Sequence, residues 1–173
     1  MKAVAALLIC GLGLVSPACE PGWTQFKEDC IWFSNSAKIW SSAENDCRSK
    51  GAWLLSDDNE DKHNFLSSIL YAFKSFHFNK FFIGGSDTAF ENQWRWLETG
   101  VSVGPYTKWG LEEPDGNNTK NCLAVRWQND TNLVWSDEIC GHSASHHHHA
   151  HGSLNYICEK HVNNSGSMVI GRR

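Results

Sequence analysis

The cysteines constrain the fold of this chain more than any other sequence feature. The sequence holds seven cysteines among 173 residues. Cys10 lies within residues 1–18, which have the features of a secretory signal peptide: Lys2 at the start, an apolar run over 3–15 and small residues at 16–18. Removal of this segment leaves six cysteines, which an oxidising compartment is expected to pair as three disulfides. They are Cys19, Cys30, Cys47, Cys122, Cys140 and Cys158.

The spacing of these cysteines does not choose among the fifteen possible pairings. It is not typical of a zinc ribbon or of a redox pair, so we expect structural disulfides.

Net charge and the length of the apolar runs argue against a nucleic-acid-binding protein and against a membrane-spanning protein. The formal net charge is −4, and it becomes −5 once Lys2 is removed with the signal peptide. A mildly acidic chain is a poor nucleic-acid binder, because affinity for phosphates depends on lysine and arginine. The apolar run over 3–15 is too short to span a membrane, and no later run is longer. We therefore expect one secreted domain without a membrane span.

Hydrophobic periodicity predicts two helices followed by strands. The first helix is expected over 36–50, capped by Ser36, with an inward face of Ala37, Trp40, Ala43 and Cys47. The second is expected over 58–73, with an apolar stripe of Phe65, Leu66, Ile69 and Phe73. Strands are expected at 31–33, 81–85, 123–127, 133–135 and 155–159. This order indicates an α+β fold. Residues 86–121 show little periodicity, and a loop of this length in a compact domain is usually functional.

A series of short motifs stands in the order found in one known family. The motifs are Gly22-Trp23-Thr24-x-Phe26, Phe82-Ile83-Gly84-Gly85, Trp94-Arg95-Trp96, Glu113-Pro114-Asp115, Trp135-Ser136-Asp137 and Tyr156-Ile157-Cys158-Glu159. Over residues 19–160 the chain thus resembles the C-type lectin-like domains. The resemblance implies two helices, small antiparallel sheets and a long ligand-binding loop region. It also implies the disulfides Cys19–Cys30, Cys47–Cys158 and Cys122–Cys140. Residues 161–173 are expected to be a disordered tail.

The resemblance further implies a principal calcium site that also binds a sugar. Its ligand-binding residues are Glu113, Asp115, Ser136 and Asp137, of which the three acids match as calcium ligands. Calcium takes six to eight oxygen ligands, and carboxylates suit it. We predict a cis Glu113–Pro114 bond, since this isomer is common only before proline. Ser136 stands where the family usually has asparagine.

Lys120 departs most from the family pattern, because it replaces a usual glutamate ligand. An ammonium has no acceptor and cannot bind a cation. It either lies between Glu113 and Asp115 as an internal counter-ion, or turns into solvent and leaves calcium to bind weakly. Glu113 and Asp115 both only accept hydrogen bonds at neutral pH, so the family's sugar preferences do not transfer.

Two further groups of residues are candidate metal sites. An accessory calcium site would use Asp87, Glu91 and Asn121, and the alternative is a solvated acidic loop. Residues 141–157 contain an insertion rich in histidine, which suits transition metals. A solvated low-complexity loop and a pH-responsive surface are the alternatives. The histidines of this metal hypothesis are His146, His147, His148, His149 and His151.

Three sequons predict N-glycosylation at Asn117, Asn129 and Asn163. A glycan on Asn117 would crowd the Glu113-Pro114-Asp115 loop. Trp109 and Trp127 are either core residues or platforms on which a sugar stacks.

No nucleophile and base stand at a spacing typical of catalysis, so we do not expect an enzyme. The hypothesis is a secreted lectin-like protein that binds glycans of cell or microbial surfaces, with calcium as cofactor. One alternative is a calcium-independent module that binds a protein or mineral surface. Another is a transition-metal binder built on the histidine-rich insertion.

Overall fold

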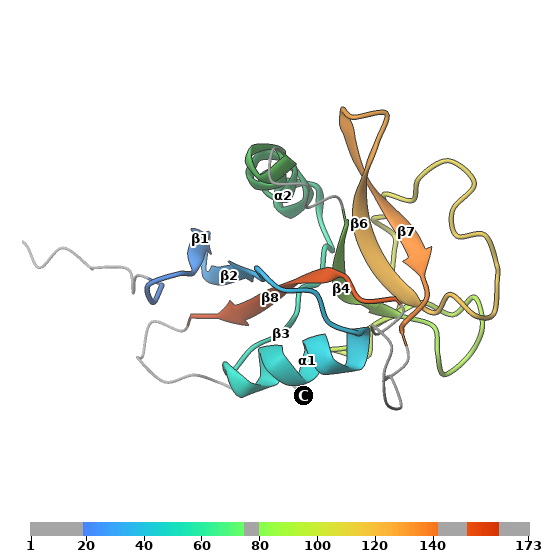
Figure 1. Cartoon of the computed structure of the whole chain (residues 1–173), viewed down its shortest axis with the longest axis horizontal. Helices are drawn as coiled ribbons and strands as arrows, with labels where there is room; N and C mark the ends of the chain where they lie inside the picture. Colours follow the sequence, from blue (N-terminus) through green and yellow to red (C-terminus); the bar gives the residue numbers. More distant parts are fainter. Residues whose placement is uncertain (1–18, 75–79, 142–151, 163–173) are drawn as a thin grey trace, which may run out of the picture.

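The computed structural model describes residues 19–74, 80–141 and 152–162 (Figure 1). The predicted signal peptide, the histidines at 146–151 and the third sequon at Asn163 lie outside these residues. Within them the chain forms two helices, α1 (Trp40–Ser49) and α2 (Glu60–Phe73). The strands are β1 (Thr24–Phe26), β2 (Asp29–Phe33), β3 (Trp53–Leu54), β4 (Lys80–Ser86), β5 (Arg95–Trp96), β6 (Cys122–Gln128), β7 (Asn132–Glu138) and β8 (Asn155–His161).

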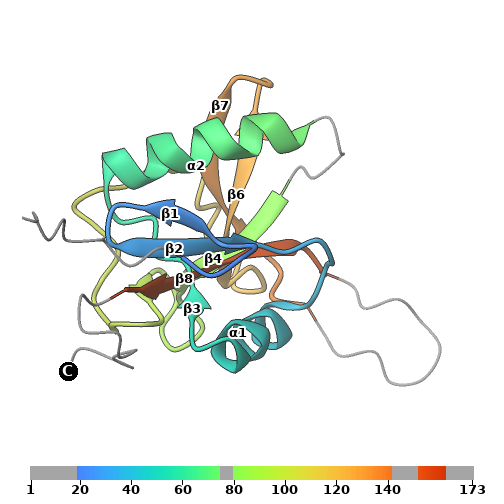
Figure 2. The same ribbon diagram turned by 90° about the vertical axis from the view of Figure 1, so that its left-hand side faces the viewer.

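The strands join in one sheet of order β1-β2-β8-β4-β6-β7, with β3 beside β8 and β5 beside β4. The named strands pair antiparallel except for β4 and β8, which run parallel through Phe81↔Asn155 and Phe82↔Tyr156. The expectation of antiparallel sheets alone is corrected by this pairing, which gives a mixed sheet. Figures 1 and 2 show α1 and α2 on opposite sides of the layer formed by β2, β8 and β4. The α+β fold class is confirmed.

Both helices begin later than the sequence predicts. Residue 38 is held in an extended conformation, because the Lys38 backbone donates to Leu154 (2.9 Å) and accepts from it (3.0 Å). The helix α1 therefore starts at Trp40 without a side-chain cap, and Ser36 is not the cap. The helix α2 starts at Glu60 because the Asn59 side chain caps it.

Two hydrophobic clusters lie on the two sides of the sheet. The smaller one contains Ala43 and Cys47 of α1 and Tyr156 of β8. The larger one lies toward α2 and contains Trp135, which is fully buried. The Trp135 ring makes edge contacts with three aromatic rings, and its indole N–H donates to the buried Asp57 carboxylate over 2.7 Å. One of those rings belongs to Trp109, so the core fixes the start of the long loop that follows it.

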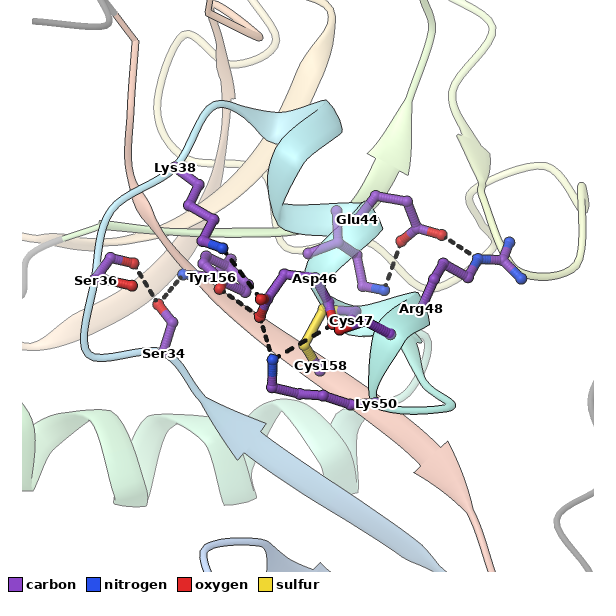
Figure 3. Close-up of a disulfide and its surroundings, with 12 residues drawn as sticks. Ser34, Ser36, Lys38, Glu44, Asp46, Cys47, Arg48, Lys50, Tyr156 and Cys158 are labelled. Atoms are coloured by element: carbon purple, nitrogen blue, oxygen red, sulfur yellow. Dashed lines mark hydrogen bonds and ion pairs between the residues drawn. A yellow bond between two sulfur atoms is a disulfide. The ribbon is translucent and has the colours of Figure 1, made fainter.

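The three predicted disulfides are confirmed: Cys19–Cys30, Cys47–Cys158 and Cys122–Cys140. Cys47–Cys158 joins α1 to β8 across a sequence separation of 111 residues. Figure 3 shows this bond beside Asp46, whose carboxylate accepts from Lys38, Lys50 and the Tyr156 hydroxyl. Cys122–Cys140 connects the start of β6 with the segment after β7, at the base of the long loop region.

The strand β8 continues to His161, one residue beyond the predicted end of the domain. The His161 imidazole contacts the Asp29 carboxylate through Nδ1 and lies 3.2 Å from Glu98 through Nε2. Hydrogen bonds to Asp29 and Glu98 raise the pKa of His161 to about 10.

Candidate functional site

Hydrogen bonds to residues of β7 anchor the segment 109–121. Its first residue, Trp109, forms an isolated parallel bridge with Trp135, and the Gly110 N–H donates to the Trp135 carbonyl over 2.9 Å. Further along, the Asp115 N–H donates to Asp137 Oδ2 over 3.0 Å. The loop therefore reaches this conformation through hydrogen bonds of the chain itself. The Glu113–Pro114 bond is cis, as predicted.

Both acids of the Glu113-Pro114-Asp115 motif face an internal cation. The Lys120 ammonium donates to Asp115 Oδ2, and Arg126 Nη2 donates to Glu113 Oε1 over 2.9 Å. The hydrogen bond from Lys120 lowers the pKa of Asp115, and the same bond raises the pKa of Lys120. Lys120 is thus a counter-ion of Asp115 and is not turned into solvent. Glu113 has Arg126 as its cation instead.

Sequence reasoning missed Arg126. The residue lies in β6 between Val125 and Trp127, and it is the one charged residue of that strand. A Cβ atom on Gly110 would come within 3.4 Å of Arg126 Nη2 and 3.1 Å of Val134 Cγ2, so the glycine leaves room for the guanidinium. A lone arginine within an apolar strand was the available sequence signal, because a charge in such a strand requires a partner.

Asp137 and Glu113 form the buried part of the site. The Asp137 side chain is almost fully buried and the Glu113 side chain is 13% exposed. Burial, together with the neighbouring Glu113 carboxylate, raises the pKa of Asp137 to about 7. Asp137 Oδ1 and Glu113 Oε2 are buried and have no hydrogen-bond partner among the described residues. These two oxygens could therefore share one proton between them, or each could accept a hydrogen bond from a ligand.

The residue set does not fit calcium in this arrangement. Within 19–74, 80–141 and 152–162, no group of three or more acidic, histidine or cysteine side chains is placed to hold a metal ion. A calcium ion at the motif would meet Lys120 and Arg126 beside its expected ligands. The Ser136 hydroxyl donates to Glu138 Oε1 over 2.9 Å, so this predicted ligand is engaged by another acid. Calcium binding here stays a prediction that the geometry does not favour.

The predicted accessory site is brought together in part. The Asp87 N–H donates to the Asn121 carbonyl over 3.3 Å, which places these two residues side by side. Asp87 is buried and its Oδ2 accepts from the Asn92 N–H over 2.8 Å, whereas Glu91 is exposed. Asp87 Oδ1 and Asn121 Oδ1 have no partner among the described residues. Two oxygens fall short of the coordination that calcium requires.

A cavity of about 340 Å³ opens at the principal motif, and we call it the charge-lined pocket. Its lining consists of Lys80, Glu113, Lys120, Arg126, Trp127, Asp137 and Glu138. Lys80 donates to Glu138 Oε1 over 2.6 Å, so this cation also has an acidic neighbour. The half-buried Trp127 ring forms one wall and makes an edge contact with the exposed Tyr71 at 6.0 Å.

This arrangement suits hydroxyl groups of a sugar. A hydroxyl donates one hydrogen bond and accepts others, and each acid–cation pair presents an acceptor beside a donor. The cations therefore supply the donors that Glu113 and Asp115 lack. The Trp127 indole, which the Lys74 ammonium approaches to 5.5 Å from the ring centroid, adds apolar surface to the lining.

Two of the three sequons lie within the described residues, and Asn117 and Asn129 are both exposed. Asn117 belongs to the site loop, because its N–H donates to Asp115 Oδ1 over 2.9 Å. Its side-chain oxygen accepts from the Thr119 N–H (3.1 Å) and hydroxyl (2.9 Å). Glycosylation at both positions stays a prediction.

No helix among the described residues has the length and apolar character that crossing a membrane requires.

The lectin C-type domain model matches residues 36–160 of the chain. C-type lectin domain family 4 member E of Homo sapiens is 28% identical over 131 residues, which are 75% of this chain and 58% of that protein. Ladderlectin of Oncorhynchus mykiss is 32% identical over 126 residues, which are 72% of this chain and 64% of that protein. The chain thus spans less than two thirds of the length of these two relatives.

A solved structure described as a calcium-independent type II antifreeze protein superposes with a TM-score of 0.65. It is 25% identical, and the match covers 83% of this chain and 95% of that one. By the match to the family model, the fold and the three disulfides, this chain belongs to the C-type lectin domain family.

Proposed function

We propose that this chain is a secreted carbohydrate-binding protein whose charge-lined pocket holds sugar hydroxyls without calcium. The observation that carries the proposal is the pair of internal cations, Lys120 on Asp115 and Arg126 on Glu113. These two cations neutralise the carboxylates, as a calcium ion does in a calcium-dependent lectin site. Removal of residues 1–18 as a signal peptide would deliver the domain to the oxidising compartment that its disulfides need.

Electrostatics oppose calcium at this site. Two like unit charges about 4 Å apart repel by about 4 kcal/mol at an effective dielectric near 20, and a divalent ion doubles this figure. Calcium binding would therefore require both cations to leave their carboxylates. The Glu113–Arg126 pair resists this, since its side chains are only 13% and 24% exposed.

The relatives support a carbohydrate ligand, because several of them carry the word lectin in their names. The antifreeze protein supports binding without calcium, because it has this fold and is described as calcium-independent. We propose binding and not catalysis for this pocket, because the relatives named above are lectins.

The proposed binding uses three kinds of group. Lys80, Lys120 and Arg126 donate to sugar oxygens, and their carboxylate partners accept from sugar hydroxyls. The Trp127 ring stacks on the sugar. Ligand binding thus exchanges part of each ion pair for hydrogen bonds to the sugar.

A glycan array probed with the mature protein tests this function. Trp127→Ala removes the platform and should weaken binding of the preferred glycan at least tenfold, since an aromatic contact contributes about 1.5 kcal/mol together with lost apolar burial. Phe90→Ala removes an aromatic side chain that is 65% exposed and lies outside the pocket lining, so it is the matched control. Absence of glycan binding in both calcium and EDTA would refute the proposal.

A further inference from the structure

Arg95 is the exception among the lysines and arginines of residues 19–74, 80–141 and 152–162. Every other lysine and arginine of the described residues lies within 4.0 Å of a carboxylate oxygen. In the same part of the chain no ion pair involves Arg95, and its Nη1 donates to the Gly100 carbonyl over 3.0 Å. The side chain is exposed. An uncompensated guanidinium is unusual on a chain of net charge −4 in which the other described lysines and arginines are paired.

Arg95 lines a second cavity, of about 310 Å³, which we call the Arg95 pocket. Its lining consists of Asn92, Gln93, Trp94, Arg95, Ser102, Val103 and Trp109. None of these residues lines the charge-lined pocket. The two pockets are therefore separate sites, although both border the segment 109–121, which begins at Trp109.

The backbone around β5 holds the walls of the Arg95 pocket in place. Arg95 and Ser102 face each other in an antiparallel bridge, and the Val103 N–H donates to the Trp94 carbonyl over 2.9 Å. The Asn92 N–H donates to Asp87 Oδ2, which fixes the other side. Hydrogen-bonded backbone segments therefore form the frame of the pocket.

Two indoles form the aromatic part of the pocket. Trp94 is 9% exposed, and it contacts the half-buried Trp109 edge-on with 5.1 Å between ring centroids. The Trp94 indole Nε1–H is buried and has no acceptor among the described residues. Buried donors in folded proteins are almost always paired, so this indole N–H beside the pocket calls for an acceptor, which a bound water or a ligand would supply.

The remaining lining groups define the ligand chemistry. The amides of Asn92 and Gln93 and the hydroxyl of Ser102 donate and accept hydrogen bonds, which suits sugar hydroxyls. Arg95 is the one charged residue of the lining, and no acid opposes it there. A guanidinium binds a carboxylate or a sulfate through two parallel N–H groups. The two tryptophans offer apolar surface to a pyranose ring.

We propose that the Arg95 pocket binds an acidic sugar residue, one that carries a carboxylate or a sulfate. The guanidinium holds the anion, the amides and the serine hydroxyl hold ring hydroxyls, and the indoles contact the ring. This site is additional to the proposed function of the charge-lined pocket and does not depend on it.

Calorimetric titration of the mature protein with three tetrasaccharides tests the proposal. The ligands are tetragalacturonate, its neutral methyl ester, and a sulfated tetrasaccharide of neutral sugars. We expect wild type to bind at least one acidic ligand at least tenfold more tightly than the methyl ester, since a charge-assisted pair is lost in the ester. Preference for the carboxylated or the sulfated ligand then identifies the source of the anion. Equal binding of all three ligands, or binding of none, overturns the proposal.

Variants assign any such binding to the pocket. Arg95→Gln keeps hydrogen-bonding capacity without the charge, and it should weaken acidic-ligand binding about tenfold or more. Lys27→Gln removes an exposed cation at the β1–β2 turn, and it should leave the affinity within about twofold. Lys120→Gln reports separately on any acidic-ligand binding in the charge-lined pocket, whose lining includes this cation. If Arg95→Gln binds as wild type does while Lys120→Gln does not, the acidic sugar belongs to the other pocket and this inference is wrong.

The Trp94 indole provides a second readout that is independent of affinity. In a proton–nitrogen spectrum, acidic ligand should shift the Nε1–H resonance that disappears in Trp94→Phe. An unchanged resonance at saturating ligand would also contradict the proposed binding mode.

Discussion

Replacement of both internal cations, in the variant Lys120→Glu/Arg126→Met, should make the stability of this protein depend on calcium. The first substitution supplies the carboxylate that Lys120 replaces. The second removes the guanidinium from Glu113, whose side chain is 13% exposed. Removal of one partner from a fully buried ion pair costs about 3–5 kcal/mol. Because Arg126 is 24% exposed, water screens the site, and we expect a loss of about 2 kcal/mol without calcium.

Calcium should restore that loss in the variant. A ligand at about 100 times its Kd stabilises the folded state by about 2.7 kcal/mol, which is slightly more than the expected loss. Urea unfolding, followed by tryptophan fluorescence with intact disulfides, measures the free energy of unfolding in millimolar calcium and in EDTA. The wild type should give the same value in both, because its cations are internal.

The matched control is Arg48→Met. Arg48 pairs with Glu44, whose side chain is 12% exposed, so this variant also removes the cation from a largely buried acid. It lies in α1, away from the charge-lined pocket, and calcium should not rescue it. If calcium stabilises the wild type as strongly as the double variant, the internal cations do not replace the ion and the reasoning is refuted.

Three further predictions concern the frame around the site. Replacing Cys47 and Cys158 by serine should lower the free energy of unfolding by about 4–5 kcal/mol, because their loop of about 110 residues is no longer closed; a loss below about 1 kcal/mol in urea unfolding would contradict this. Trp135→Phe should cost about 2–3 kcal/mol in the same assay, since it creates a cavity and leaves a buried carboxylate without its indole donor; an unchanged midpoint would contradict it. His161→Gln should destabilise more at pH 6 than at pH 10. The folded pKa of about 10 lies above the ordinary 6.5, so the stabilisation is complete below about pH 6.5 and is lost as pH rises through about 10; an equal loss at both values would contradict it.

Much of the fold could be predicted from the order of its motifs. The cysteine spacing alone left fifteen pairings, and the resemblance selected the three that the structure contains. The helix positions followed from apolar periodicity. The start of α1 did not, because Lys38 pairs with Leu154, a contact between residues that lie far apart in the sequence.

The site was predicted less completely, because it also depends on contacts between residues that lie far apart in the sequence. Sequence reasoning identified Lys120 as the residue that opposes calcium, because the resemblance places it where the family usually has a glutamate ligand. The partner of Glu113 could not be found in that way. Arg126 reaches Glu113 only because β6 and the loop pack against each other with Gly110 between them. The unpaired state of Arg95 is also a property of the whole fold, since it depends on where every acid lies.

The most direct test of calcium independence is the affinity for glycan with and without calcium. The measurement is calorimetric titration of wild-type mature protein with the preferred array glycan, first in millimolar calcium and then in EDTA. We predict dissociation constants that agree within about twofold, because Lys120 and Arg126, and not calcium, are the cations of the site in both conditions. A loss of affinity of about tenfold or more in EDTA, reversed when calcium is added back, would contradict the account.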